Sequence, residues 1–131
     1  MNLNLVLSND APAVESHQNV LISDLDKVPS RGCRSFILNH SINYLTDEQL
    51  YKVLDKIRHG GIVSITSPDA MEAASALCWG NIDMTAFSSL TANKNKQYSI
   101  IEVKSLLEQE GYKIENATIN ELVFYIRAQR P

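Results

Sequence analysis

The stretch from residue 35 to residue 69 constrains the fold more than any other part of the chain, because it has the pattern of a strand, a helix and a second strand. Residues 35–40 hold a short apolar run, and residues 62–66 hold a second run rich in β-branched side chains. Between them, apolar residues recur at i, i+3, i+4 and i+7, which predicts an amphipathic helix of about three turns. These residues are Leu50, Val53, Leu54 and Ile57. Two strands joined by one such helix form a βαβ unit with parallel strands and a right-handed crossover, so the chain is predicted to form an α/β sheet.

Both ends of this helix carry sequence signals. Thr46 offers its hydroxyl as an N-cap, and Gln49, three residues later, completes a capping box. At the other end, basic residues precede Gly60 and Gly61, and a glycine can supply the positive φ with which many helices end. We therefore expect a helix over residues 46–57 that these two glycines terminate.

The segments on the N-terminal side add strands to this unit. Residues 3–7 and 20–22 are short apolar runs, which predict two further strands. The segment between the second of them and the βαβ unit, residues 24–34, contains Pro29 and Gly32 and is too broken for a full crossover helix.

The segments on the C-terminal side add helices and a strand pair. Asp69 and Ser99 each stand three residues before a glutamate, which predicts two capped helices, and residues 82–90 have a weaker helical pattern. Residues 112–119 and 122–128 predict an antiparallel pair of strands. We therefore expect a single α/β domain over residues 1–131, with a mostly parallel sheet that ends in this antiparallel pair.

Composition excludes several classes of partner. The net charge of −3 and the lack of a clustered basic run argue against a nucleic-acid partner. No run approaches the roughly 20 apolar residues of a membrane span, and the N-terminus lacks the pattern of a signal peptide. The two cysteines, Cys33 and Cys78, have no CxxC spacing and are expected to be free thiols in the cytoplasm.

The spacing of residues alone gives little indication of a catalytic, metal or ligand site. No grouping of histidine, cysteine and carboxylates has the spacing of a metal site, and no catalytic residue is assigned. Asn39 and His40 end a predicted parallel strand, and ligands of α/β proteins bind at that side of the sheet. Asp24 and Asp26 also follow a strand, where they are either ligand contacts or solvated turn carboxylates.

Several short phrases of the sequence occur in the same order as in a known family. They are Asp24-Leu25-Asp26-Lys27-Val28-Pro29, Phe36-Ile37-Leu38-Asn39-His40, Ile57-Arg58-His59-Gly60-Gly61-Ile62-Val63-Ser64-Ile65 and Pro68-Asp69. With these phrases the chain resembles the class I S-adenosylmethionine-dependent methyltransferases over almost its whole length. The resemblance implies a small, Rossmann-like sheet and a small-molecule methyl acceptor. It also implies that S-adenosylmethionine is the cofactor and that its binding residues are Asp24, Leu25, Asn39 and His40.

The chain departs from the family at three places. Val6-Leu7-Ser8 follows Leu3-Asn4-Leu5 where the family has glycines, which let the backbone approach the cofactor. The family's next βαβ unit, whose strand ends in a carboxylate that binds the ribose hydroxyls, has no counterpart in the short segment 8–19. The position after His40 also differs, since Asn43-Tyr44 replaces a Glu-His pair. We therefore expect weak or absent binding of the cofactor.

Two functions remain compatible with these observations. The first is a compact methyltransferase with weakened cofactor binding. The second is a non-catalytic module, derived from the methyltransferase fold, that acts in binding or assembly. Loss of one βαβ unit removes helices and strands that would cover the sheet, so we also expect a homodimer or a complex with a protein partner, formed by the N-terminal forty residues.

Overall fold

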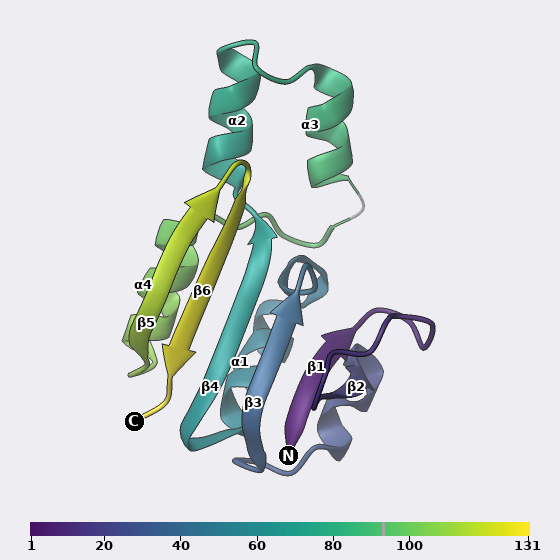
Figure 1. Ribbon diagram of the computed structural model, residues 1–131, viewed down its shortest axis with the longest axis vertical. Coiled ribbons are helices and arrows are strands. Elements are labelled where there is room, and N and C mark those ends of the chain that lie inside the picture. Colours follow the sequence, from purple (N-terminus) through teal and green to yellow (C-terminus); the bar gives the residue numbers. More distant parts are fainter. Residues whose placement is uncertain (93) are drawn as a thin grey trace.

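The computed structural model describes residues 1–92 and 94–131, which contain one six-stranded sheet with the strand order β2-β1-β3-β4-β6-β5 (Figure 1). The strands are β1 (Asn2–Val6), β2 (Gln18–Leu21), β3 (Cys33–Asn39), β4 (Ile57–Pro68), β5 (Lys113–Asn120) and β6 (Val123–Gln129). The first four strands run parallel to one another, whereas β6 runs antiparallel to both β4 and β5. This topology confirms the predicted α/β sheet with its antiparallel C-terminal pair.

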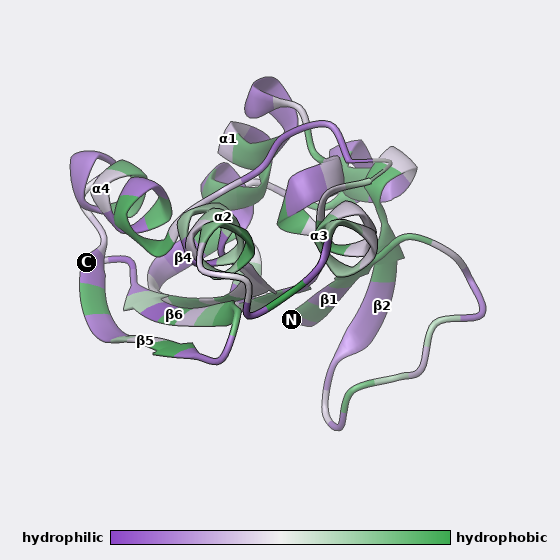
Figure 2. Cartoon of the chain, turned by 90° about the horizontal axis from the view of Figure 1, so that it is seen from above, coloured by the Kyte–Doolittle hydropathy of each residue, from purple (hydrophilic) through white to green (hydrophobic). Residues whose placement is uncertain are grey.

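The helices are distributed unevenly around this sheet. They are α1 (Asp47–Lys56), α2 (Ala70–Cys78), α3 (Met84–Thr91) and α4 (Ile100–Gln109), with short 3₁₀ helices η1 (Ile22–Lys27) and η2 (Ile42–Tyr44). Helices α1 and α4 lie on the same side of the sheet, as Figure 2 shows from above. Helices α2 and α3 form a pair beyond the end of β4 (Figure 1). Among the described residues, no helix has the length and apolar character that crossing a membrane requires.

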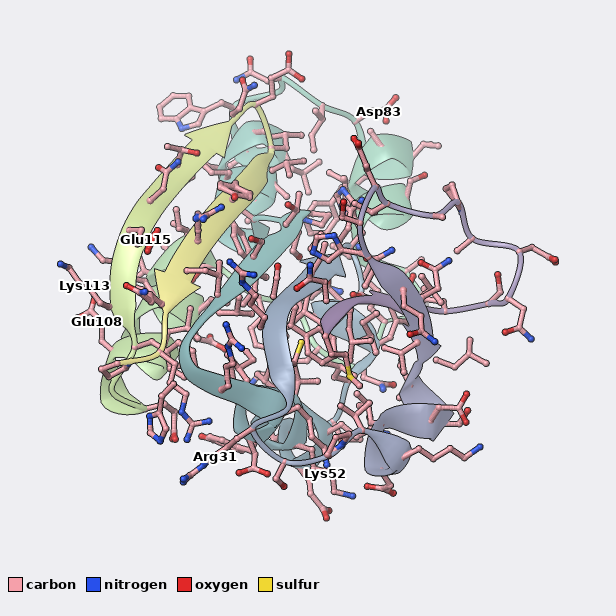
Figure 3. The ribbon with its side chains drawn as sticks, turned by 60° about the horizontal axis from the view of Figure 1, so that its bottom comes forward. Arg31, Lys52, Asp83, Glu108, Lys113 and Glu115 are labelled. Carbon is pink, nitrogen blue, oxygen red and sulfur yellow. The ribbon has the colours of Figure 1, made fainter. Side chains whose placement is uncertain are left out.

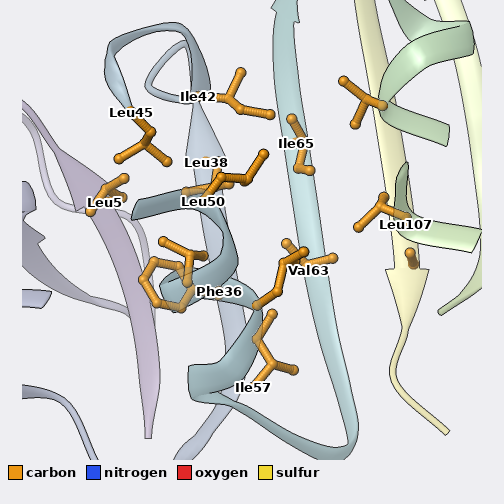
Figure 4. Close-up of a cluster of buried hydrophobic side chains, with 14 of the residues drawn as sticks. Leu5, Phe36, Leu38, Ile42, Leu45, Leu50, Ile57, Val63, Ile65 and Leu107 are labelled. Carbon is orange, nitrogen blue, oxygen red and sulfur yellow. The ribbon is translucent and has the colours of Figure 1, made fainter. Parts of the chain in front are cut away.

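The core lies between the sheet and the helices on that side. Phe36 and Leu38 of β3 stand in register with Val63 and Ile65 of β4, and all four side chains are at most 1 % exposed. Leu50 of α1 belongs to the same cluster, which Figure 4 shows in close-up. Full burial of an aliphatic or aromatic side chain contributes about 1.5–3 kcal/mol, so this cluster is a main source of stability.

The opposite face of the sheet is mostly polar. Residues that alternate with the buried ones, such as Ser35, Ser64 and Arg127, are half-buried or exposed, and no helix of the described part of the chain lies against them in Figure 2. The expectation that loss of a βαβ unit leaves bare apolar surface is therefore not met on this face. Its polar side chains allow it to meet water without a cover.

The two edges of the sheet differ in charge. On β5, Lys113 points away from the molecule (Figure 3), Glu115 pairs with Arg127 of β6 at 3.2 Å, and the register shifts between Ile114 and Asn116. Charges and bulges of this kind discourage pairing with another chain. The edge strand β2 has the sequence Gln-Asn-Val-Leu, carries no charge and is only four residues long. The N-terminal edge therefore lacks the charges of the β5 edge, while the short length of β2 limits how far another strand could pair with it.

Helix α1 begins as predicted but ends earlier. Thr46 Oγ1 accepts a hydrogen bond from the Gln49 N–H at 3.2 Å, and Gln49 Oε1 accepts one from the Thr46 N–H at 2.9 Å, which confirms the capping box. The helix ends at Lys56 and β4 begins at Ile57, so the prediction that Gly60 and Gly61 terminate the helix is wrong.

Side chains that lie far away in the sequence explain this early end. The Arg130 guanidinium donates to the carbonyl oxygens of Leu54 and Ile57, at 3.1 and 2.7 Å. The Tyr112 hydroxyl donates to the same Leu54 oxygen at 2.9 Å. The last carbonyls of a helix need such partners, and here no glycine cap supplies them.

Candidate functional site at the strand ends

The order of the strands creates a crevice at their carboxyl ends. Strand β1 is central to the parallel part, with β2 on one side and β3 on the other. The chain thus passes from β1 to β2 on one side of β1, and then to β3 on the other side of β1. Ligands of open α/β sheets bind outside the carboxyl ends of the strands at such a switch point.

A cavity of about 390 Å³ lies at this point, and we call it the strand-end cavity. It is lined by residues 4–8, 11–14, 39–41 and Tyr44. The volume falls within the range of about 300–1,000 Å³ that is typical of small-molecule sites. None of the lining residues is acidic.

Two of the predicted site residues, Asn39 and His40, line this cavity. Both side chains are exposed, and His40 has a φ of 56°, a left-handed conformation that is uncommon outside glycine. The His40 N–H donates to the Thr66 carbonyl of β4 at 2.7 Å, which fixes this turn against the neighbouring strand. The backbone of His40 therefore has a defined place at the mouth of the cavity.

The surroundings of His40 favour the uncharged form of its imidazole. Partial burial lowers the pKa of His40, and the positive charge of Lys94 lowers this pKa further. Burial also lowers the pKa of Lys94, whose ammonium donates to the Leu90 carbonyl and forms no salt bridge with any carboxylate of the described residues. Near neutral pH, the imidazole is therefore a neutral group with one donor and one acceptor.

Asn43, which precedes the cavity-lining Tyr44, joins three segments of the chain by hydrogen bonds, a role that the sequence did not reveal. Its side chain is fully buried and accepts a hydrogen bond from the Ser67 hydroxyl at 2.8 Å, while its amide donates to the Lys96 carbonyl at 3.1 Å. Its own carbonyl accepts from the N–H groups of Asn95 and Lys96. The residue that replaces the family's glutamate thus ties three segments to one another.

The other two predicted site residues lie elsewhere. Asp24 belongs to η1, pairs with Lys27 at 3.1 Å and lines a separate hollow of about 260 Å³ beside Met1 and Leu3. Leu25 is 2 % exposed and belongs to the core. The four predicted residues are therefore not brought together, and ligand binding by Asp24 and Leu25 stays a prediction without geometric support.

Two lining residues that sequence reasoning missed carry buried polar atoms. Asn4, within β1, is 4 % exposed, and Ser41, directly after His40, is 1 % exposed. Asn4 Oδ1 and Ser41 Oγ have no hydrogen-bond partner among the described residues. The sequence signal for Asn4 was that a polar residue interrupts the apolar run Leu3-Asn4-Leu5.

Solved methyltransferase structures share this architecture. A SAM-dependent methyltransferase from Mesorhizobium loti matches with a TM-score of 0.63 and 16% identity, over 98% of this chain and 79% of that protein. One from Archaeoglobus fulgidus matches with a TM-score of 0.60 and 16% identity, over 88% of this chain and 68% of that protein. One from Thermotoga maritima matches with a TM-score of 0.60 and 12% identity, over 88% of this chain but only 63% of that protein.

Comparison of sequences alone finds no relative. No protein-family model matches the chain, and no curated protein matches it. At 16% identity or less, these three likenesses concern the path of the backbone rather than the residues of a site. The 131 residues have the Rossmann-like fold of the S-adenosylmethionine-dependent methyltransferases.

Proposed function

We propose that this protein is an S-adenosylmethionine-dependent methyltransferase with weakened cofactor binding, and that the cofactor binds in the strand-end cavity. The observation that carries this proposal is the position of the cavity, at the switch point of a methyltransferase fold. Asn39 and His40, which line it, are the proposed contacts. The methyl acceptor is a small molecule.

The cavity has a suitable position and volume for the cofactor, but the side chains that line it are less suitable. Val6 and Leu7 line it where a close backbone approach would need glycine, and the side chain of Leu7 is 51% exposed. Branched side chains there reduce the room for a ligand. Weak binding follows from this wall rather than from a missing cavity.

Methyl transfer requires little acid–base chemistry from the protein. When bound, the cofactor supplies a methyl group that its sulfonium already activates. The residues of the chain then have to orient the ligand and exclude water. The neutral imidazole of His40 can donate one hydrogen bond and accept another at the mouth of the cavity, which suits a positioning role.

Calorimetric titration with S-adenosylhomocysteine tests the proposal. We expect measurable binding that is weaker than the low-micromolar range, which corresponds to about −8 kcal/mol. The His40→Asn variant keeps a residue that tolerates a positive φ and should weaken binding, because the imidazole is lost. His59→Asn is the matched control, since His59 lies at the other end of the sheet against Pro131.

Three results would speak against parts of this proposal. Low-micromolar affinity would show that Val6 and Leu7 do not obstruct the site. Equal affinity of wild type and His40→Asn would remove His40 from the site. Weaker binding by Asp24→Ala would restore the sequence-based prediction for Asp24, which lies outside the strand-end cavity.

A second candidate function is a non-catalytic binding or assembly module. The observation in its favour is that no carboxylate lines the strand-end cavity, while the charge of Lys94 acts on His40. A sulfonium is a cation and gains nothing from such surroundings. On this alternative, neither S-adenosylmethionine nor S-adenosylhomocysteine binds, and the chain acts through self-association or a protein partner.

Self-association is a further part of the proposal. The lack of charge on the edge strand β2 supports a homodimer formed by the N-terminal part of the single domain, because an uncharged strand edge can pair with another chain. Light scattering at micromolar concentration should give the mass of two chains. Gln18→Lys places a charge on this edge and should lower that mass, whereas Thr118→Lys on the β5 edge should not. A mass of one chain for the wild type would contradict the dimer.

A further inference from the structure

A further hollow, of about 600 Å³, lies on the polar face of the sheet, and we call it the open-face hollow. Strands β1, β3, β4, β5 and β6 all contribute to its lining, together with His17 just before β2. It shares no lining residue with the strand-end cavity, so the two are separate. Because no helix of the described residues covers this face in Figure 2, a molecule from solvent can enter the hollow.

The open-face hollow contains a serine and a histidine that form a hydrogen bond. His17 Nε2 and Ser35 Oγ are 3.0 Å apart, and His17 Nδ1 lies 2.9 Å from the Glu15 carbonyl oxygen. A carbonyl oxygen can only accept, so Nδ1 carries the proton that is donated to Glu15. In the neutral imidazole Nε2 is then unprotonated, and the Ser35 hydroxyl must donate to it.

The loop before β2 is fixed against β1, which positions His17. The His17 N–H donates to the Val14 carbonyl at 3.0 Å, and the Asn2 amide donates to the Ser16 carbonyl at 3.3 Å. Asn2 also pairs in register with Ser35 of β3. His17 and Ser35 therefore approach each other from the two sides of β1, and both side chains are half-buried and line the hollow.

This arrangement has the features of an activated nucleophile. A serine hydroxyl is a weak nucleophile until an adjacent base takes its proton, and a third group has to orient that base. His17 is placed as the base of Ser35, and the Glu15 carbonyl is placed as the orienting group. The guanidinium groups of Arg34 and Arg127 line the same hollow. Positive charge there would stabilise the oxyanion that forms when an acyl group is attacked.

We propose that the open-face hollow is an acyl-transfer site, with Ser35 as nucleophile and His17 as general base, that hydrolyses small esters carrying a negative charge. Ser35 Oγ forms a bond to the acyl carbon while its proton moves to His17 Nε2. The ester C–O bond then breaks, and the alcohol leaves with that proton. Water next attacks the acyl carbon and gives one proton to the imidazole, which returns it to Ser35 Oγ as the acid leaves.

The charges of the open-face hollow favour an anionic ester. Arg127 Nε donates to Glu115 Oε2 at 3.2 Å, so the charges of this pair offset each other. Arg34 forms no salt bridge with any carboxylate of the described residues. One positive charge is therefore left without a partner, and it attracts a carboxylate or a similar group on the substrate.

Turnover of para-nitrophenyl acetate gives the first test. Wild type should release nitrophenolate catalytically. Ser35→Ala should abolish this turnover, and His17→Asn should slow it about 100-fold or more, the contribution of a general base. Absence of turnover by the wild type would overturn the proposal, and so would an unchanged rate in Ser35→Ala.

Matched controls test whether this particular pair is needed. Ser64 is half-buried on the same face, and His59 Nδ1 also lies against a carbonyl oxygen, that of Pro131 at 2.8 Å. Ser64→Ala and His59→Asn should keep the wild-type rate. Ser35→Cys should still be acylated, because a thiol beside the same base is also a nucleophile. Loss of all reaction in Ser35→Cys, or an equal loss in Ser64→Ala, would overturn the proposal.

A derivative of para-nitrophenyl acetate with a carboxylate on its ring tests the charge of the substrate. After correction for the rates in buffer, wild type should prefer the charged ester by about two- to fivefold in kcat/KM, the effect of one partly exposed ion pair. Arg34→Gln should remove this preference. An unchanged preference in Arg34→Gln would overturn the assignment of an anionic substrate.

Discussion

Replacing Leu54 with alanine is expected to cost about 2–5 kcal/mol of unfolding free energy, the range for truncation of a buried leucine. Leu54 lies on the apolar face of α1 and is 4 % exposed. A domain has about 5–15 kcal/mol of stability in total, so the loss is a large fraction of it. Chemical denaturation of the purified variant measures this loss.

A second leucine-sized side chain provides the control. Ile101 on α4 is apolar but 68% exposed, so Ile101→Ala should change the unfolding free energy by less than about 0.5 kcal/mol. If Leu54→Ala cost less than about 1 kcal/mol, the apolar face of α1 would have to lie in solvent, which would contradict the packing described above.

Replacing Asp69 with alanine is expected to cost about 2–4 kcal/mol, because this one carboxylate serves two helices. Its Oδ1 accepts from the Glu72 N–H at 2.9 Å and caps α2, while its Oδ2 accepts from the Ile100 N–H at 2.8 Å at the start of α4. Asp69 is only 1 % exposed, so water does not readily replace the lost partner. Urea denaturation of Asp69→Ala gives the size of the loss.

Replacing Asp83 measures the effect on stability of losing one helix cap instead of two hydrogen bonds to two helices. Its carboxylate caps α3 alone, by accepting from the Ala86 N–H at 2.8 Å, and it is exposed. Asp83→Ala should therefore cost about 1 kcal/mol. Equal losses in the Asp69 and Asp83 variants would mean that the bond to Ile100 contributes nothing to stability.

Local signals in the sequence predicted the elements of the fold well. The βαβ unit follows from the spacing of apolar residues, and the caps at Thr46, Asp69 and Ser99 follow from residues three positions apart. Such signals depend on neighbours along the chain, which a sequence shows directly. The end of α1 depends instead on Tyr112 and Arg130, more than fifty residues away, and no local pattern contains that information.

The candidate site was predicted only in part for the same reason. Asn39 and His40 lie at the end of β3 because the carboxyl end of a parallel strand is a local feature of the sequence, and their role as ligand contacts stays a prediction. The position of Asp24 depends on how η1 turns back along the sheet, which the broken segment after β2 does not specify. Asn4 and Ser41 are notable only because they are buried and because one side-chain oxygen of each lacks a hydrogen-bond partner. Burial and missing partners are properties of the assembled sheet.

The contact between Arg130 and the end of α1 bears on the order in which the chain can fold during synthesis. The arginine stands 76 residues after Leu54, whose carbonyl it binds. At about 5–20 residues per second, a ribosome needs roughly 4–15 s to add that many residues. During this interval β3, α1 and β4 are already made, but the helix end lacks its arginine partner. The central unit of the sheet therefore stays incomplete until the β6 segment has emerged.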